Sequence, residues 1–199
     1  AYRRRKVRVW QSIVVGVAFL VSLTAWVGAG GNVPVVFLLT GTIGLSTAIV
    51  LGALSGVIGE RVGIVNIAIE AQLLGGAFTA AVVATTTGNH IVALVAAMVV
   101  GALIAVVLAT FAIVYVVDQV IVGVVLIALV TAVTNFLYSA VLSSNSSQFN
   151  NPGTLPLLPI PFLSDIPVVG PVFFGQRLTT YLIVVPVPLT WFVLFRWKW

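Results

Sequence analysis

The sequence contains no cysteine, a single histidine and very few charged residues. The absence of cysteine excludes a disulfide framework, a thiolate metal site and a lipidated cysteine. Only 7% of the 199 residues are charged and 61% are hydrophobic, whereas roughly 25% of the residues in a soluble domain are charged. This composition is that of a membrane protein, and no stretch has the composition of a separate soluble domain.

Apolar runs of about 20 residues recur along the whole chain, and each can cross a hydrocarbon core of about 30 Å as a helix. We therefore predict an all-α, polytopic transmembrane bundle that forms a single domain over residues 1–199. The predicted spans are residues 9–29, 33–58, 64–86, 91–117, 120–142 and 178–197.

The segment 143–177 differs from the spans because it contains six of the nine prolines. Proline removes backbone donors, so no spanning helix is expected there. Its apolar content argues against disorder, and we predict an external loop that packs on the outer face. In the last span, Pro186 and Pro188 should kink the helix.

Positive charge is concentrated ahead of the first span, and the net charge is +5. The basic residues there are Arg3, Arg4, Arg5, Lys6 and Arg8. Cytoplasmic segments carry such an excess, which predicts a cytoplasmic N-terminus and makes nucleic acid unnecessary as a partner. Six spans then leave Arg177 as the one basic residue on the outer side. The same start resembles a signal peptide with a cleavage site at 27–29, but the long apolar run favours a retained span.

Small residues recur at helical spacing in two spans, and we predict that they support helix packing. They are Gly52, Gly56, Gly59 and Gly63 in the first set, and Ala97, Gly101 and Ala105 in the second. The first set is also dense enough in glycine to mark a broken helix around 59–63.

A polar cluster interrupts the apolar sequence between the second and third spans. Its members are Glu60, Arg61, Asn66, Glu70 and Gln72. Glu60 and Arg61 can offset each other, while Asn66 and Glu70, four residues apart, are expected on one helical face. Glu70 has no local cation, so it must protonate, find a partner on another helix or face water. It therefore indicates either a solute path or a buried tie between helices.

The fifth span has polar residues at its start and along one face. Asp118 and Gln119 precede it, and Asp118 could cap the helix or have a functional role. Thr131, Asn135 and Tyr138 follow at i, i+4 and i+7, so they share a face. That face either makes interhelical hydrogen bonds or lines a solute path.

Two residues that could suggest catalysis lack partners. His90 lies in a short turn without accompanying carboxylates, so we assign it no role and expect no metal site. Ser46 lies within the second span, far from that histidine, so no pair of nucleophile and base can be proposed. An intramembrane serine hydrolase is accordingly the least favoured hypothesis, and we expect that this chain is not an enzyme.

The polar cluster lies within a longer motif. Residues 59–72, GERVGIVNIAIEAQ, resemble the GERxGVVNIGxEGQ signature of the permease subunits of nucleoside and simple-sugar ABC importers. Residues 118–123 resemble the DQIVxG segment of these permeases, and residues 163–171 resemble the LSDIPVLGP segment of their external loop. Ala68 and Ala71 stand where the family usually has glycine, which slightly restricts the backbone.

This resemblance implies a permease subunit of an ATP-driven importer in a bacterial-type cytoplasmic membrane. It implies a homologous second permease, a cytoplasmic ATPase that holds ATP and Mg²⁺, and an external substrate-binding protein or lipoprotein. No cofactor is expected in this chain. Nucleosides are the first expected solute, and pentoses or other simple sugars are the second.

Within this reading, Asn66, Glu70 and the face of Thr131, Asn135 and Tyr138 are the candidates for lining the path. Members of the family are longer, and their coupling loop should follow the position of residues 196–199, so we expect a chain truncated before it. An ion-coupled secondary carrier is the alternative from another class, because broken helices and a midplane carboxylate suit it equally well.

Overall fold

The computed structural model describes residues 9–28 and 34–196. Its regular elements there are helical, apart from one isolated β-bridge between Leu157 and Arg177. Five helical segments are long and apolar enough to cross a membrane: Val35–Arg61, Ile69–Thr87, His90–Val114, Gln119–Leu142 and Leu178–Phe195. A shorter apolar helix, Ile13–Trp26, lies ahead of them. The prediction of a polytopic helical bundle is confirmed.

The helices follow one another with short connections, except ahead of α7. In chain order they are α1 (Val9–Val27), α2 (Val35–Arg61), α3 (Ile69–Thr87), α4 (His90–Ala109), α5 (Gln119–Leu137), α6 (Ser146–Phe149), α7 (Leu178–Tyr181) and α8 (Pro186–Phe195). Three short π-helical turns accompany them: η1 (Thr110–Val114) after α4, η2 (Tyr138–Leu142) after α5, and η3 (Gly170–Phe174) ahead of α7.

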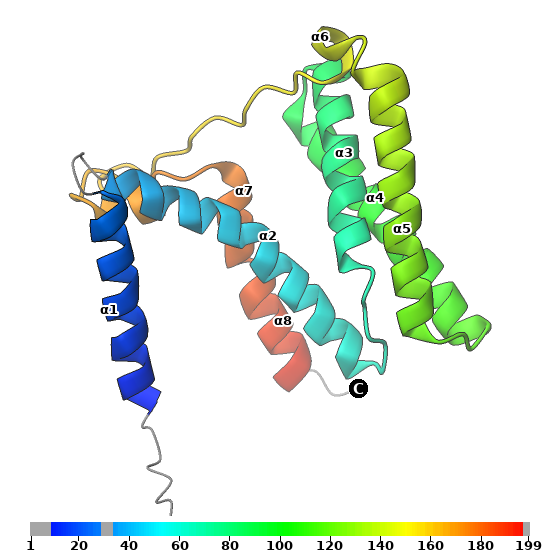
Figure 1. Ribbon diagram of the computed structural model, residues 1–199, viewed down its shortest axis with the longest axis horizontal. Helices are drawn as coiled ribbons and strands as arrows, with labels where there is room; N and C mark the ends of the chain where they lie inside the picture. Colours follow the sequence, from blue (N-terminus) through cyan, green and yellow to red (C-terminus); the bar gives the residue numbers. More distant parts are fainter. Residues whose placement is uncertain (1–8, 29–33, 197–199) are drawn as a thin grey trace, which may run out of the picture.

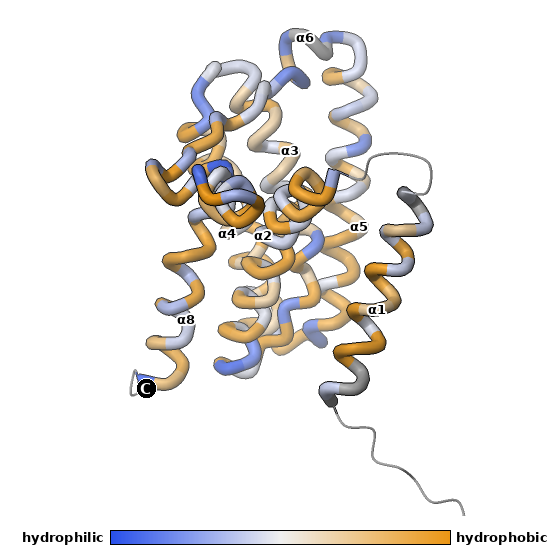
Figure 2. Tube along the Cα trace, turned by 90° about the vertical axis from the view of Figure 1, so that its left-hand side faces the viewer, coloured by the Kyte–Doolittle hydropathy of each residue, from blue (hydrophilic) through white to orange (hydrophobic). Residues whose placement is uncertain are grey.

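The described helices form two groups that meet where α2 contacts α3 (Figure 1). One group is a bundle of α3, α4 and α5, with α6 at one end, and the other packs α2 against η3, α7 and α8. Helix α1 stands apart and contacts no other described element. In Figure 2, apolar residues run along the helices and hydrophilic residues gather near helix ends and turns.

Small residues lie at several close helix contacts. A Cβ placed on Gly52 would lie 3.3 Å from Ile69 Cγ2, and one on Gly56 would lie 3.6 Å from Ile69 Cδ1, so both glycines face α3. Helices α3 and α4 pack most extensively, and a Cβ on Gly76 would lie 3.4 Å from the carbonyl oxygen of Ala97. One turn further, a Cβ on Gly101 would lie 3.9 Å from the Gln72 carbonyl oxygen, and Ala105, in the next turn, is half-buried.

The third span begins later than predicted. Helix α2 ends at Arg61 and α3 starts at Ile69, so residues 62–68 are not helical. The predicted start at residue 64 is wrong, and Gly63 does not continue the glycine face of α2. The alternative interpretation of this glycine-rich run is a break around 59–63. The structure keeps residues 59–61 helical and places the non-helical residues at 62–68, between two successive helices.

The segment 143–177 contains only short helical pieces and crosses from the α3–α5 group to α7 (Figure 1). The Asn151 amide donates to Thr85 Oγ1 of α3 at 3.1 Å, and Gln176 Nε2 donates to the Thr40 carbonyl oxygen of α2 at 3.2 Å. The segment therefore links the two helix groups. The last span is composite, because Pro186 and Pro188 lie in the first turn of a new helix, α8.

The expected cytoplasmic basic cluster at 3–8 and the last three residues, 197–199, lie outside the described residues.

Candidate functional site

The chain reverses between α2 and α3 through a helix-ending motif that requires glycine. Gly63 has φ +83, and its amide donates to the Glu60 carbonyl oxygen at 3.1 Å. The Ile64 amide donates to the Gly59 carbonyl oxygen at 2.9 Å, which completes a Schellman motif. A Cβ on Gly59 would lie 2.8 Å from the Ile64 carbonyl oxygen. Gly59 and Gly63 therefore serve the break itself.

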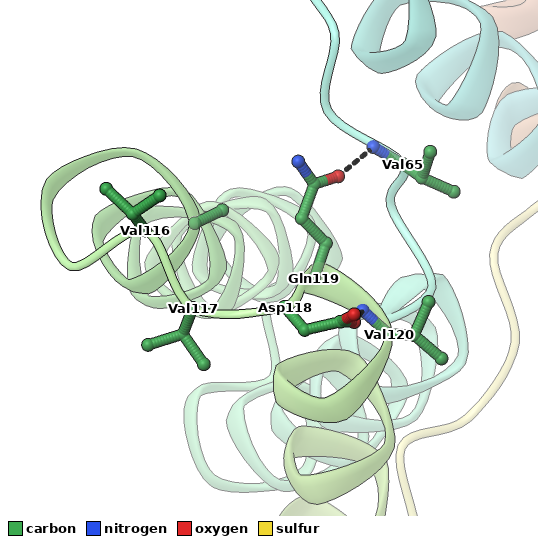
Figure 3. Close-up of a pocket in the computed structure, with 7 residues that line it drawn as sticks. Val65, Val116, Val117, Asp118, Gln119 and Val120 are labelled. Carbon is green, nitrogen blue, oxygen red and sulfur yellow. Dashed lines mark hydrogen bonds between the residues drawn. The ribbon is translucent and has the colours of Figure 1, made fainter.

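The side chain of Gln119, at the start of α5, holds the segment after the break (Figure 3). Its Oε1 accepts the Val65 amide at 2.6 Å, and its Nε2 donates to the Gly63 carbonyl oxygen at 3.2 Å. Irregular backbone at membrane depth persists only where protein or water satisfies its polar groups. Gln119 does this for two of those groups.

The segment then runs along α5 for about one helical turn, or about 6 Å of rise. A Cβ on Gly123 would lie 2.8 Å from Ile67 Cβ and 3.4 Å from the Ala68 amide nitrogen. The absence of a side chain at Gly123 therefore allows the 62–68 segment to lie directly against α5. Ala68 and Ala71 are 0% exposed and pack with Leu108 and Val122. Helix α3 therefore begins inside the bundle, beyond the first turn of α5.

Asn66 and Gln72 form a reciprocal amide pair at the start of α3. Asn66 Nδ2 donates to Gln72 Oε1 at 3.1 Å, and Gln72 Nε2 donates to Asn66 Oδ1 at 3.3 Å. The predicted helical face shared by Asn66 and Glu70 is wrong, because Asn66 precedes the helix. Its partner is the amide of Gln72, two residues beyond Glu70.

Glu70 lies exposed in the first turn of α3. The N-cap residue Ala68 has no side chain that can satisfy the first amides of this helix. The helix dipole favours a carboxylate at this position. The structure therefore combines an open helix N-terminus, a carboxylate and an amide pair at one level of the bundle.

The connection between α4 and α5 forms an open depression of about 530 Å³ beside this segment (Figure 3). Asp118 Oδ1 accepts the Val120 amide at 2.8 Å and the Ile121 amide at 3.3 Å, so Asp118 caps α5. Glu60 and Arg61 lie apart from this depression, exposed at the end of α2 beside Phe195.

The polar face of α5 lies at another level. Thr131 is half-buried, whereas Asn135 and Tyr138 are exposed. Asn135 is about 24 Å of helix rise from Gln119. None of these three side chains hydrogen-bonds the Asn66–Gln72 pair, and Asn135 and Tyr138 lie further along α5 and η2 than Val130, which is beside Gly75 of α3. The two sets therefore form separate polar groups along the α3–α5 bundle.

Sequence reasoning missed two features. One is the pair of hydrogen bonds by which Gln119 holds the 62–68 segment, called the Gln119 clamp below. The other is the buried position of Gln176. The motif at 118–123 singled out Gln119, but its hydrogen-bond partners could not be predicted, because they are backbone groups more than 50 residues away. Gln176 is 4% exposed and follows a proline-rich stretch that carries no periodic signal.

These features define a multi-pass helical membrane protein in which a non-helical connection leads from α2 into the bundle, where α3 begins. The chain belongs to the family described as branched-chain amino acid transport system / permease component, whose model matches residues 38–196. The match begins after α1, the helix that stands apart from the bundle.

Three relatives are similar to the chain. It is 34% identical over 159 residues to the putative glucose ABC transporter permease protein TsgC13 of Haloferax volcanii, covering 80% of this chain and 48% of the relative. It is 31% identical over 162 residues to the guanosine ABC transporter permease protein NupQ of Bacillus subtilis, covering 78% and 50%. It is 29% identical over 159 residues to the nucleoside ABC transporter permease protein NupC of Lactococcus lactis, covering 76% and 49%.

The chain spans about half the length of the curated relatives it matches. No solved structure gives a significant match.

Proposed function

We propose that this chain is a transmembrane permease subunit of an ATP-driven importer, with a nucleoside as the first expected solute and a simple sugar as the second. The observation that carries this function is the interrupted α2–α3 connection. It places the Asn66–Gln72 amide pair and exposed Glu70 at a helix N-terminus inside an apolar bundle. Transporters use helix N-termini beside non-helical segments within the bundle to present polar groups to a solute.

The names of the relatives support this solute class. They specify glucose, guanosine and nucleosides, and all three are called ABC transporter permease proteins. Glucose and nucleosides share a ring that carries hydroxyl groups. Asn66 and Glu70 would contact the solute at one level, and Thr131, Asn135 and Tyr138 at the other.

The subunit would work with partners that supply energy and solute. A second, homologous permease would complete the path, a cytoplasmic ATPase would bind and hydrolyse ATP with Mg²⁺, and an external binding protein would deliver the solute. The N-terminus would lie in the cytoplasm, as the basic residues ahead of α1 predict. The segment 143–177 would then face the binding protein, and the chain itself would perform no covalent chemistry.

The test is uptake by the complete transporter in sealed vesicles. We expect accumulation of labelled guanosine or ribose that requires ATP and persists when the proton gradient is collapsed. Copurification should recover a second permease and an ATPase with this chain. Uptake that follows the proton gradient and ignores ATP depletion would instead identify an ion-coupled secondary carrier.

A further inference from the structure

A buried glutamine near the other end of α2 leaves one polar atom without a partner among the described residues. Gln176 Nε2 donates to the Thr40 carbonyl oxygen at 3.2 Å and to the Val172 carbonyl oxygen at 2.7 Å. Carbonyl oxygens only accept hydrogen bonds, so the amide nitrogen must face them and Oε1 must point elsewhere. Within the part of the chain that the structure describes, no donor bonds Oε1, and this oxygen is accessible from outside although the residue as a whole is buried.

The free oxygen lies at the wall of a depression between α2 and α7. It is 4.0 Å from the position that a Cβ on Gly44 would occupy, and both Gly44 and Gln176 line the depression. The depression has a volume of about 410 Å³, within the range of roughly 300–1,000 Å³ typical of small-ligand sites. A Cβ on Gly41 would meet nothing within 4 Å, so the missing side chain leaves this space open.

The remaining polar groups of the depression also have bonding capacity to spare. Thr179 and Thr180 are half-buried, and neither hydroxyl bonds another described residue. Arg177 donates through Nη1 to the Leu155 carbonyl oxygen, which fixes its position beside the depression. Phe37, 74% exposed, adds an aromatic ring to the lining.

The open acceptor Oε1 favours a ligand that carries hydroxyl groups. Oε1 of Gln176 can only accept, and a carboxylate or a fully ionised phosphate offers only acceptors. A hydroxyl group can donate to Oε1 and also exchange hydrogen bonds with Thr179 and Thr180. The ring of Phe37 offers an apolar face against which a sugar ring can pack.

We propose, resting on the transport function proposed above, that this depression is a second solute subsite that binds a neutral cyclic polyol. The polyol is either a free sugar or the ribose of a nucleoside. In the proposed topology the subsite lies at the external end of α2, so a solute released by the binding protein meets it before the Asn66–Gln72 level. Arg177, the one basic residue expected on the outer side, then serves to position the wall of this subsite.

The test measures equilibrium binding of labelled D-ribose, D-glucose and guanosine to the complete transporter in nanodiscs, without the external binding protein. Replacing Thr179→Val together with Thr180→Val removes two hydroxyls that have no partner among the described residues. We expect binding to weaken at least tenfold, with an unchanged thermal unfolding midpoint. Ribose binding assigns the subsite to the free sugar, and binding of guanosine alone assigns it to the nucleoside.

Gly41→Leu fills the depression and should remove the polyol bound there, so the number of bound molecules per transporter falls while the solute at the Asn66–Gln72 level stays bound. Its matched control is Gly16→Leu in α1, another helical glycine whose Cβ would meet nothing within 4 Å, which should leave binding unchanged. Equal affinity in all these variants, or no polyol binding by the parent protein, overturns the subsite. Displacement of the polyol by inorganic phosphate overturns its neutral specificity.

The subsite and the proposed function can fail separately. ATP-dependent uptake by the parent transporter, with equal polyol affinity in the Thr179, Thr180 and Gly41 variants, overturns the subsite alone. Polyol binding that these variants lose, in a transporter without ATP-dependent uptake, overturns the importer function and supports the subsite.

Discussion

Gln119 and Val65 lie 54 positions apart in the sequence, yet Oε1 of Gln119 accepts the amide of Val65 at 2.6 Å. The same side chain donates to the Gly63 carbonyl oxygen. One amide thus satisfies both a donor and an acceptor of the non-helical segment, and it fixes that segment against the start of α5. The position of Glu70 and Asn66 in the bundle depends on this attachment.

Gln119→Leu keeps a side chain of similar size and removes both hydrogen bonds. We expect the free energy of unfolding to fall by about 1–2 kcal/mol, because each net hydrogen bond contributes about 1 kcal/mol. Thermal unfolding in nanodiscs measures the change. Gln148→Leu, at an exposed position of α6, is the matched control and should be neutral. Equal unfolding midpoints for both variants would contradict the clamp.

Gly123→Ala should disturb the packing of the segment ahead of α3 against α5. The new Cβ would lie 2.8 Å from Ile67 Cβ, which is too close for either backbone to accept without moving. We expect destabilisation of about 1–3 kcal/mol, the usual effect of overpacking.

Gly101→Ala is the control for this substitution, since its Cβ would make only an ordinary contact at 3.9 Å. It should be neutral or stabilising by up to about 1 kcal/mol through helix propensity. If Gly123→Ala proved as stable as Gly101→Ala, the close approach of Ile67 to α5 would be refuted.

Glu70→Gln removes the carboxylate at the start of α3 and keeps the shape of the side chain. We expect uptake to fall about tenfold, equivalent to about 1.4 kcal/mol, while the complex still assembles. The assay is ATP-driven uptake in vesicles, alongside gel filtration of the complex. Glu60→Gln, exposed at the end of α2, should retain uptake. Unchanged uptake in Glu70→Gln would remove this carboxylate from the mechanism.

Phe162 is 88% exposed in the segment 143–177 and has φ +67, a conformation that aromatic residues seldom adopt. If this segment receives the binding protein, Phe162→Asn should lower ATPase activity that the binding protein stimulates. Asparagine tolerates the same backbone conformation, so the fold should persist. Basal ATPase activity is the internal control, and an equal loss of both activities would indicate misfolding instead.

The spans were predictable because hydropathy is a local property. Helix α5 with η2 occupies Gln119–Leu142, close to the predicted 120–142, and Asp118 caps it. The break before α3 was harder to place. Ile64, Val65 and Ile67 are as apolar as a spanning helix, so hydropathy extended the third span across a segment that is not helical.

The polar residues show the same difference between what local sequence predicts and what only the fold decides. Sequence spacing pairs Asn66 with Glu70, but that spacing has meaning only within a helix, and Asn66 bonds Gln72 instead. Likewise, nothing local marks Gln176 as buried, because its partner Thr40 lies 136 positions away.

The sequence by itself determined that this protein is a multi-pass helical membrane protein, because the transfer free energy of each apolar run depends only on its own residues. Its ordered motifs also indicated the permease family. The tertiary structure alone decided where α3 begins, which amides pair and which polar atoms stay open. Those outcomes depend on backbone groups that a distant side chain satisfies, and local composition carries no record of such contacts.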